Sequence, residues 1–361
     1  MKTSLALWGN QLHSGERTYP IVPNRRRWLI ISGAAMVFCI AVLLVRGLNF
    51  GVDFTGGNVY TVSDVENPDS QIAFDVIAKN APEEEPRVQI LGGDSVRVQI
   101  GIVETDVDRQ IKADLAEGYG ASTDQVSSQQ IGPTFGDEVG KKAIQSLVVF
   151  LVLVALVMTV YFRAWRMAVA GIIALVHDLV FTVGIYAIIG FEVTPASVIG
   201  FLTILGYSLY DTVVVFDKVR ENTDGLTAQH RYTYDELANL ALNQTLVRSI
   251  NTSVVALLPV AAILFIGAFV LQAGTLKDIS LALFVGMAVG TYSSIFVATP
   301  LEVTLRDREE RIQKHTAEVL ELRASGKSDV VIDEAGNVRV GALQPGTHQG
   351  TQAQPKRKGR K

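Results

Sequence analysis

The stretch "GYSLYDTVVVFDKVREN", residues 206–222, places a carboxylate, Asp211, inside a long apolar run. The preceding residues, "SVIGFLTILGYSLY", have the composition of the first half of a membrane-spanning helix, and "TVVVF" continues it. An ionised Asp near the middle of a bilayer costs about 2.5–3.5 kcal/mol even on the most lenient insertion scale. A carboxylate kept at that cost indicates a role inside the protein, either functional or structural.

The whole chain has the composition of a membrane protein, with a mean hydropathy of +0.29 over its 361 residues. A membrane span needs about 20 mostly apolar residues. Six stretches meet this requirement, at residues 28–45, 143–162, 167–190, 197–219, 249–271 and 279–301. The first stretch is too long for a cleaved signal peptide and lacks a small-residue cleavage site, so we expect it to remain as a span.

Lysine and arginine placement predicts the orientation of these spans, because cytoplasmic loops carry an excess of both. Basic residues precede span one, lie in the link between spans two and three, lie between spans four and five, and follow span six: Arg25, Arg26, Arg27, Arg163, Arg166, Lys218, Arg220, Arg231, Arg248, Arg306, Arg308 and Arg311. The other two links carry one lysine between them. Both termini are therefore expected on the cytoplasmic side.

We expect five regions along the chain: a cytoplasmic arm (1–27), a first span (28–48), an extracytoplasmic domain (49–139), a bundle of spans two to six (140–305) and a charged tail (306–361). In the external domain, "GNVYTVSDV" and "VRVQILGGDSVRVQIGI" alternate like strands, and "DSQIAFDVIAKNA" and "DVDRQIKADLAEGYG" have helical periodicity. This predicts a small, acidic α+β domain.

Two cytoplasmic segments have their own patterns. Residues about 228–247 read as a short amphipathic helix on the membrane surface. The tail is expected to begin as a charged helix and then, from about Ser325, to be disordered by composition. Its basic end, "PKRKGRK", could contact anionic lipid or ribosomal RNA, but a solubilising tail is the favoured interpretation.

Polar residues inside the spans are the candidate functional residues. Span three contains His177 and Asp178, and span four contains Asp211 with Tyr207 on the same helix face. Adjacent helical residues point about 100° apart, so His177 and Asp178 need not touch. Span five opens with a polar stripe at helical spacing that is expected to face inward: Gln244, Arg248, Asn251 and Thr252.

These residues support one structural hypothesis with two functional interpretations. Charges in lipid pair with one another or line water-filled routes, so Asp211 is expected to face Arg248 and the span-three pair across the bundle interior. Burial and a neighbouring arginine act on a carboxylate in opposite directions, which would let Asp211 exchange a proton as its surroundings change. The alternative is a static salt bridge that only fixes the helix packing.

Three stretches together resemble the SecF branch of the SecD/SecF family, within the RND superfamily, over about residues 20–305. They are "GLNFGVDFTGGNVY", "ALVHDLVFTVGIYAIIGFEVTPASVIGFLTILGYSLYDTVVVFDKVREN" and "LNQTLVRSINTS". The resemblance implies an α-helical polytopic fold of six transmembrane helices, an RND-type half, with a small α+β extracytoplasmic domain.

The resemblance also implies roles for individual residues. Asp211 would be the proton-responsive carboxylate and Arg248 its basic partner, with His177 and Asp178 in the same proton-coupling set. The signature "DFTGG" would be a hinge at the root of the external domain: Asp53, Phe54, Thr55, Gly56 and Gly57. Glycine permits the positive φ of a tight turn there, and a plain turn is the alternative. Tyr210 departs from the family pattern, because many relatives carry Asn before the Asp.

The implied function is an accessory subunit of the Sec protein translocase in the bacterial cytoplasmic membrane, driven by the proton motive force. Implied partners are a SecD-like subunit, the SecYEG channel with SecA and YidC- or YajC-type proteins, the exported polypeptide and membrane lipid, with no specific nucleic acid. An RND-type exporter half for small molecules or lipids and a non-transporting assembly scaffold are the alternatives.

Neither an enzyme nor a resident cofactor is expected. No phosphate-binding glycine loop, nucleophile elbow or metal-ligand cluster occurs in the sequence. The single cysteine, Cys39, cannot form an intrachain disulfide, and no zinc or iron–sulfur spacing exists. Any ATP hydrolysis would belong to a partner.

Overall fold

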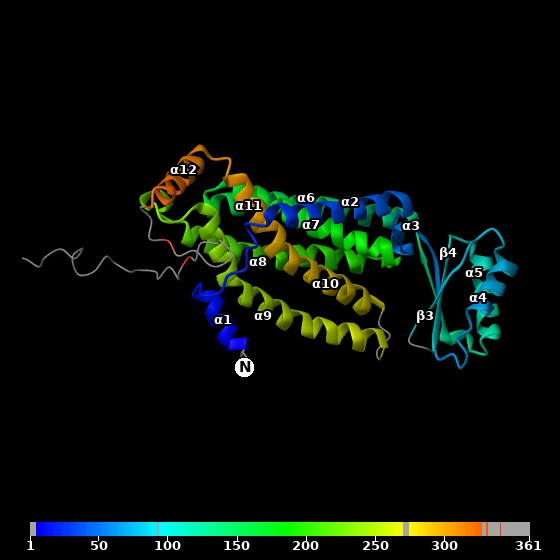
Figure 1. The fold of residues 1–361 in the computed structure, drawn as a ribbon. Coiled ribbons are helices and arrows are strands. Elements are labelled where there is room, and N and C mark those ends of the chain that lie inside the picture. The colour runs from blue at the N-terminus through cyan, green and yellow to red at the C-terminus, as the bar shows by residue number, and fades with distance from the viewer. Residues whose placement is uncertain (1–4, 92–93, 270–273, 327–329, 331–339, 341–361) are drawn as a thin grey trace, which may run out of the picture.

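The structure is a computed structural model that describes residues 5–91, 94–269 and 274–326, together with Val330 and Val340. An elongated helical bundle carries a small α+β domain at one end and helix α12 (Glu310–Ala324) at the other (Figure 1). Helix α1 (Leu5–His13) lies near the α12 end, alongside the start of α9.

Among the described residues, six helices are long and apolar enough to cross a membrane, which confirms the expected fold class. They comprise α2 (Arg25–Arg46), α6 (Pro133–Phe162), α7 (Trp165–Ile189), α8 (Pro195–Asn222), α9 (Tyr234–Phe269) and α10 (Gly274–Ser293), which continues through the π-helical turn η3 (Ser294–Ala298) into α11 (Thr299–Arg306).

Local sequence explains where the central helices begin and end. Helix α8 starts at Pro195 behind a capping box in which Thr194 and Ser197 satisfy each other's backbone amides. Helix α7 ends at Gly190, whose φ of 85° suits a residue without a side chain. Helix α9 has no Pro or Gly before Pro259, so the amphipathic segment expected at about 228–247 is continuous with the fifth span.

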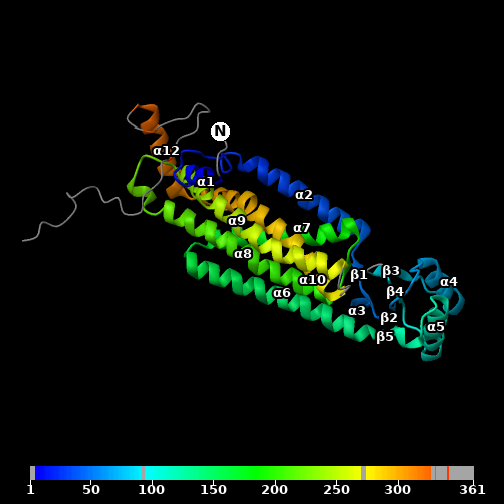
Figure 2. The ribbon, with the colours of Figure 1, turned by 90° about the horizontal axis from the view of Figure 1, so that it is seen from below.

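Helix α10 lies at the centre of the bundle between α8 and α9, while α2 and α6 both pack on α7 (Figure 2). Small residues allow these close approaches: Gly200 faces Ala282, Gly290 faces Ser208, and Gly184 faces Cys39. The outer surfaces of α2, α6 and α9 are apolar and exposed, as expected of helices that face lipid or another protein.

The small domain is a four-stranded antiparallel sheet in the order β3 (Arg87–Leu91), β4 (Ser95–Ile100), β2 (Gly57–Val62) and β5 (Val126–Ile131). Helices α4 (Ser70–Asn80) and α5 (Thr105–Gly118) cover the sheet face that is turned away from the bundle (Figure 1). Sequence analysis did not anticipate β5, because "VSSQQI" is mostly polar, and its residues pair with β2 at the sheet edge.

Two contacts join the domain to the bundle. A parallel pair links β1 (Asn49–Phe50) with β6 (Glu192–Val193), the strand that leads into α8. The short helix α3 (Val52–Thr55) packs on the start of α6, where Gly136 lies directly against the Phe54 backbone. The "DFTGG" signature therefore forms a helical turn that ends in two glycines with positive φ, 75° at Gly56 and 144° at Gly57.

Candidate functional site

Asp211 lies in the interior of the bundle, at the contact between α8 and α9, and is only 6% exposed. Its Oδ1 accepts a hydrogen bond of 2.7 Å from the Ser249 hydroxyl on α9. Its Oδ2 has no hydrogen-bond partner among the described residues. A buried carboxylate oxygen without a donor is unusual, because unsatisfied buried polar atoms cost about 1–3 kcal/mol.

Arg248 does not form the expected direct pair with Asp211. Its side chain is exposed, and Nη2 donates to the Tyr210 hydroxyl at 3.3 Å. The charge of Arg248 acts on Asp211 only through space. The reason is helical geometry: Ser249 occupies the position that faces α8, so its neighbour Arg248 points about 100° away.

The polar stripe predicted to face inward does so only in part. Arg248 and Asn251 are exposed, while Thr252 and Gln244 are half-buried. Gln244 is bonded to Asn222 at 3.0 Å. The residues that do face the interior are smaller, namely Thr245, Ser249 and Ser253. Sequence analysis missed them, although their spacing of four residues was a usable signal.

His177 and Asp178 are both buried and contact each other, which their adjacency on the helix left open. The distance from His177 Nδ1 to Asp178 Oδ1 is 3.2 Å, and Asp178 Oδ2 accepts a short bond from Ser208 on α8. His177 Nε2 has no partner among the described residues. Ser208 and Asp211 are three residues apart on α8, so one helix face carries the contacts of both carboxylates.

Hydroxyl groups continue this polar interior onto α9, α10 and η3. Thr212 and Ser294 lie 3.2 Å apart, and the Ser294 hydroxyl also lies beside Asp211. Thr291 donates to Ser253 at 2.7 Å. Hydroxyl groups can donate or accept, so this set can adapt to either protonation state of a neighbouring carboxylate.

A further buried carboxylate, which sequence analysis missed, lies at the end of the sixth span. Glu302 on α11 is fully buried and accepts a 2.6 Å bond from the Tyr234 hydroxyl, and Arg306 Nη1 lies 3.9 Å away. Nearby, Arg25 binds both Asp235 and Asp307. These contacts tie the ends of α2, α9 and α11 together.

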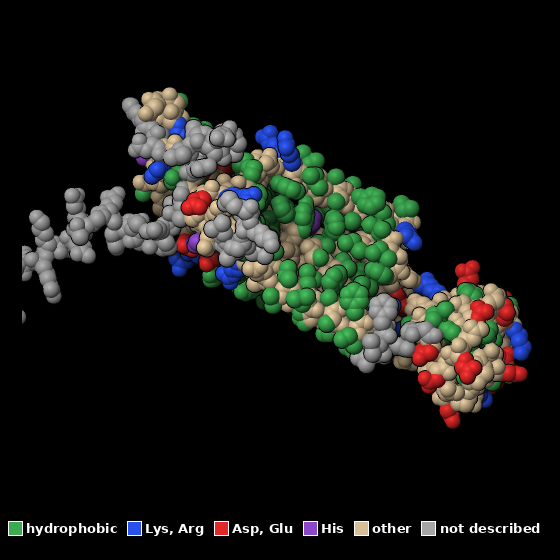
Figure 3. All heavy atoms as spheres, turned by 60° about the horizontal axis from the view of Figure 1, so that its bottom comes forward, with side chains coloured by type: hydrophobic (Ala, Val, Ile, Leu, Met, Phe, Trp, Pro, Cys, Tyr) green, Lys and Arg blue, Asp and Glu red, His purple; other side chains and the backbone are tan. Residues whose placement is uncertain are grey.

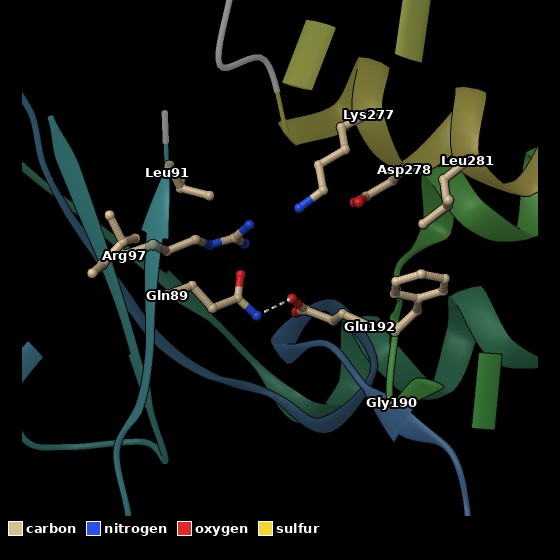
Figure 4. Close-up of a pocket in the computed structure, with 10 residues that line it drawn as sticks. Gln89, Leu91, Arg97, Gly190, Glu192, Lys277, Asp278 and Leu281 are labelled. Carbon is tan, nitrogen blue, oxygen red and sulfur yellow. Dashed lines mark hydrogen bonds between the residues drawn. The ribbon is translucent and has the colours of Figure 1, made fainter. Parts of the chain in front are cut away.

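At the opposite end, a cleft of about 340 Å³ separates the external domain from the bundle (Figure 4). Glu192 accepts bonds from Gln89 at 3.2 Å and from Gln99 at 2.9 Å. Arg97 and Lys277 point into the cleft from its two walls, and Asp278 is held by the Thr194 hydroxyl at 3.0 Å. Sequence analysis named none of these residues.

The predicted hinge lies beside this cleft. Asp53 is half-buried, and burial raises the pKa of its carboxyl, with Arg97 opposing the effect. An added Cβ at Gly57 would lie 2.3 Å from the Ile100 carbonyl oxygen, so glycine is required there by both space and φ. Across the part of the chain that the structure describes, no group of three or more His, Cys, Asp or Glu side chains could hold a metal ion.

The fold and the buried polar network define a multi-pass membrane protein built as a six-helix bundle with a small α+β domain at one end, with titratable groups inside the bundle. Two family models match the chain: "SecD/SecF GG Motif" at residues 41–63, and "Protein export membrane protein SecD/SecF, C-terminal" at residues 111–308. The chain belongs to the SecF group of the SecD/SecF family.

Individual relatives agree with this assignment. The protein translocase subunit SecF of Streptomyces coelicolor is 49% identical over 325 residues, covering 90% of this chain and 86% of the relative. SecF of Mycobacterium tuberculosis H37Rv is 44% identical, covering 88% and 74%. The crystal structure of SecDF from Thermus thermophilus, described as a translocon-associated membrane protein, matches with a TM-score of 0.71 at 30% identity, covering 81% of this chain and 39% of that one.

Proposed function

We propose that this chain is a SecF-type subunit of the Sec protein translocase that pairs with a SecD-like subunit and uses the proton motive force to promote protein export. The observation that carries the proposal is the half-satisfied carboxylate of Asp211. One of its oxygens accepts a hydrogen bond from Ser249, and the other has no hydrogen bond of normal geometry from a described residue, although the Ser294 hydroxyl lies beside the carboxylate.

Protonation of Asp211 would change the contact between α8 and α9. An ionised carboxylate only accepts hydrogen bonds, whereas the protonated form also donates one. The Ser249 and Ser294 hydroxyls beside Asp211 can reorient to match either form. A change in this contact alters the packing of α8, and α8 begins immediately after β6, whose Glu192 binds the external domain. Helix α8 therefore offers a mechanical connection between the buried carboxylate and the domain.

Pairing with a SecD-like subunit is supported by the polar face that α8 and α9 leave exposed. Tyr210, which is 54% exposed, and the exposed Arg248 and Asn251 lie on spans yet are turned outward. Charged and strongly polar side chains in spans are costly toward lipid and face a protein interior or a water-filled cavity instead. A SecD-like membrane half placed on this face would enclose Arg248 together with Asp211.

The central test is Asp211→Asn, which keeps shape and removes the titratable proton. The chain is reconstituted with its SecD-like partner and the translocon in vesicles, and export is measured with and without an imposed proton gradient. Insertion and partner binding should be retained, because removing a buried charge also removes its desolvation cost. The acceleration of export by the gradient should be lost entirely.

The matched control is Asp217→Asn, six residues further along α8, where the carboxylate is exposed and bonded to Tyr161 at 3.4 Å. This variant should respond to the gradient like the parent. If Asp211→Asn did so too, Asp211 would be a structural residue, and a scaffold function would be favoured. Gradient-driven transport of a small molecule or lipid in the absence of the translocon would favour the exporter alternative.

The pairing face is tested by a photo-activated cross-linking side chain introduced at Tyr210 or Asn251. Both positions should cross-link to the SecD-like subunit in membranes. The same probe at Val157, which is 61% exposed on helix α6, should label lipid instead. Equal cross-linking from all three positions would contradict a defined pairing face.

A further inference from the structure

A second cavity, of about 630 Å³, lies between α2, α9 and α10 near the end of the bundle that carries α1 and α12. Its lining is almost entirely apolar and largely aromatic, with Trp8, Tyr19, Trp28, Tyr292 and Phe296 among its walls. The floor includes the exposed Ala288. We call this cavity the aromatic groove. Thr291, which lines the groove, also donates to Ser253 in the polar interior, whereas Asp211 is not part of the lining.

The walls of the aromatic groove are held in place by specific contacts. Trp8 donates from Nε1 to the Tyr19 hydroxyl at 3.2 Å, and the Tyr292 hydroxyl is bonded to Ser32 at 2.8 Å. The Phe296 ring contacts both Trp28 and Tyr292, with centroids 4.4 and 5.2 Å apart. The polar ends of these side chains are therefore satisfied, and their apolar surfaces are left to line the groove.

The segment between α1 and α2 closes one end of the groove. Asn243 on α9 bonds to the backbone of Tyr19 at 2.7 Å, and Asn239 accepts from the amides of Ile21 and Val22 at 3.1 and 3.0 Å. Tyr19, Pro20, Ile21 and Asn24 all line the cavity. If a membrane helix of another protein occupied the groove, it would be about 10 Å wide and would collide with this segment where it ran past the closed end. An acyl chain can end inside the groove and need not pass the segment.

The groove is as long as the upper part of an acyl chain, and it lies next to the polar boundary of the bundle, where that part of a lipid is expected. Its α10 and η3 lining runs from Ala288 to Phe296, a rise of about 12 Å along a helix. The charged contacts of Arg25 with Asp235 and Asp307 mark the adjacent polar boundary. Aromatic side chains gather at this level in membrane proteins because their rings are amphipathic. Figure 3 shows the apolar face of the bundle with basic side chains at its border.

A basic residue of α2 adjoins the residues that line the groove. Arg27 is exposed and forms no ion pair with any described residue, while the neighbouring acidic groups, Asp235 and Asp307, are already bound by Arg25. Arg27 lies three residues after Asn24 and one before Trp28, both of which line the groove. A ligand with an apolar tail and an anionic head would satisfy both features.

We propose that the aromatic groove binds an anionic phospholipid, with an acyl chain against Trp8, Trp28 and Ala288 and the phosphate on Arg27. The site does not depend on proton coupling or on a SecD-like partner. The arginine at the headgroup should favour anionic over zwitterionic lipid by on the order of tenfold.

The chain's own tryptophans provide the test, because it contains only three. Trp165→Phe leaves Trp8 and Trp28, which both line the groove. The full-length variant is reconstituted in phosphatidylcholine bilayers that contain a small fraction of brominated phosphatidylglycerol or brominated phosphatidylcholine. The brominated anionic lipid should quench fluorescence at roughly a tenfold lower fraction than the zwitterionic one.

Four variants separate the head from the tail. Arg27→Gln should abolish the preference for the anionic lipid but keep quenching by both, and Arg27→Lys should restore the preference. Ala288→Leu should fill the groove and reduce quenching by either lipid, with the charges unchanged. Ala262→Leu, on the exposed surface of α9 outside the groove, should have no effect.

Two results would overturn the proposal. One is equal quenching by the two brominated lipids in the Trp165→Phe chain. The other is loss of all lipid quenching when the SecD-like subunit is added, which would show that a protein helix and not a lipid occupies the groove.

Discussion

Two aspartates of this chain show how neighbouring donors decide what a carboxylate can do. Asp211 accepts one hydrogen bond, and its other oxygen has none of normal geometry from a described residue. Asp114, in the external domain, is also largely buried but accepts bonds from Lys79, Asn80 and Gln110 at 2.8, 2.8 and 2.9 Å. The first can respond to a proton at little structural cost, while the second is held ionised between α4 and α5.

The Asp114 contacts predict that the packing of α4 against α5 loses stability in acid. Hydrogen bonds from Asn80 and Lys79 lower the pKa of Asp114 from 3.8 to about 2. Because the pKa is lower in the folded state, the stabilisation is complete above pH 3.8 and is lost as the pH falls toward about 2. Asp114→Asn should weaken this packing by roughly 1–3 kcal/mol at neutral pH and flatten its pH dependence.

Hydrogen exchange of the α4 and α5 amides in the full-length protein, followed from neutral to acid pH, measures the effect. Asp106→Asn is the control, because Asp106 lies on α5 with its side chain 90% exposed and paired only to Arg109. Equal protection in the two variants would mean that the Asp114 contacts do not hold the helices together.

At the scale of elements, small residues decide how closely neighbouring segments approach. Helix α6 contains two glycines one turn apart with opposite surroundings. A Cβ at Gly136 would lie 2.1 Å from the Phe54 carbonyl oxygen, whereas at Gly140 it would meet nothing within 4 Å. The contact between the "DFTGG" turn and the start of α6 therefore depends on one of these glycines and not on the other.

Gly136→Ala should push α3 away from α6 and destabilise the protein by roughly 1–3 kcal/mol, the usual cost of overpacking. Gly140→Ala should be neutral or stabilising by up to about 1 kcal/mol, because alanine is the better helix former. Thermal unfolding of the purified full-length protein, with limited proteolysis around residues 49–57, compares the two. Equal transition temperatures would show that α3 does not need to lie against α6.

At the scale of the whole molecule, the expected orientation across the membrane follows from the different charges at the two ends of the bundle. The external domain and helix α12 lie at opposite ends of the bundle (Figure 1). The domain surface is studded with acidic side chains (Figure 3), and the other end carries the arginine contacts of Arg25, Arg166 and Arg306. The positive-inside rule predicts that the arginine-rich end is cytoplasmic.

Single cysteines introduced at Glu117 on α5 and at Glu318 on α12 should report this orientation. Both positions are exposed, and the native Cys39 is buried, so the parent chain serves as the unlabelled control. In intact cells an impermeant maleimide should label only the residue 117 variant, and the residue 318 variant should react only after the membrane is opened. The reverse pattern would invert the topology and the direction of proton entry to Asp211.

The sequence by itself determined the number of spans, the existence of an external α+β domain and the presence of Asp211 within a helix, because long apolar runs and alternating strands are local patterns. It could not decide which polar residues meet. That Asp211 meets Ser249 and not Arg248, that His177 touches Asp178, and that the stripe of Arg248 and Asn251 faces outward depend on how α8, α9 and α10 are rotated against one another. Those rotations are set by close approaches between distant residues, such as Gly200 with Ala282 and Gly290 with Ser208, and only the packed structure contains them.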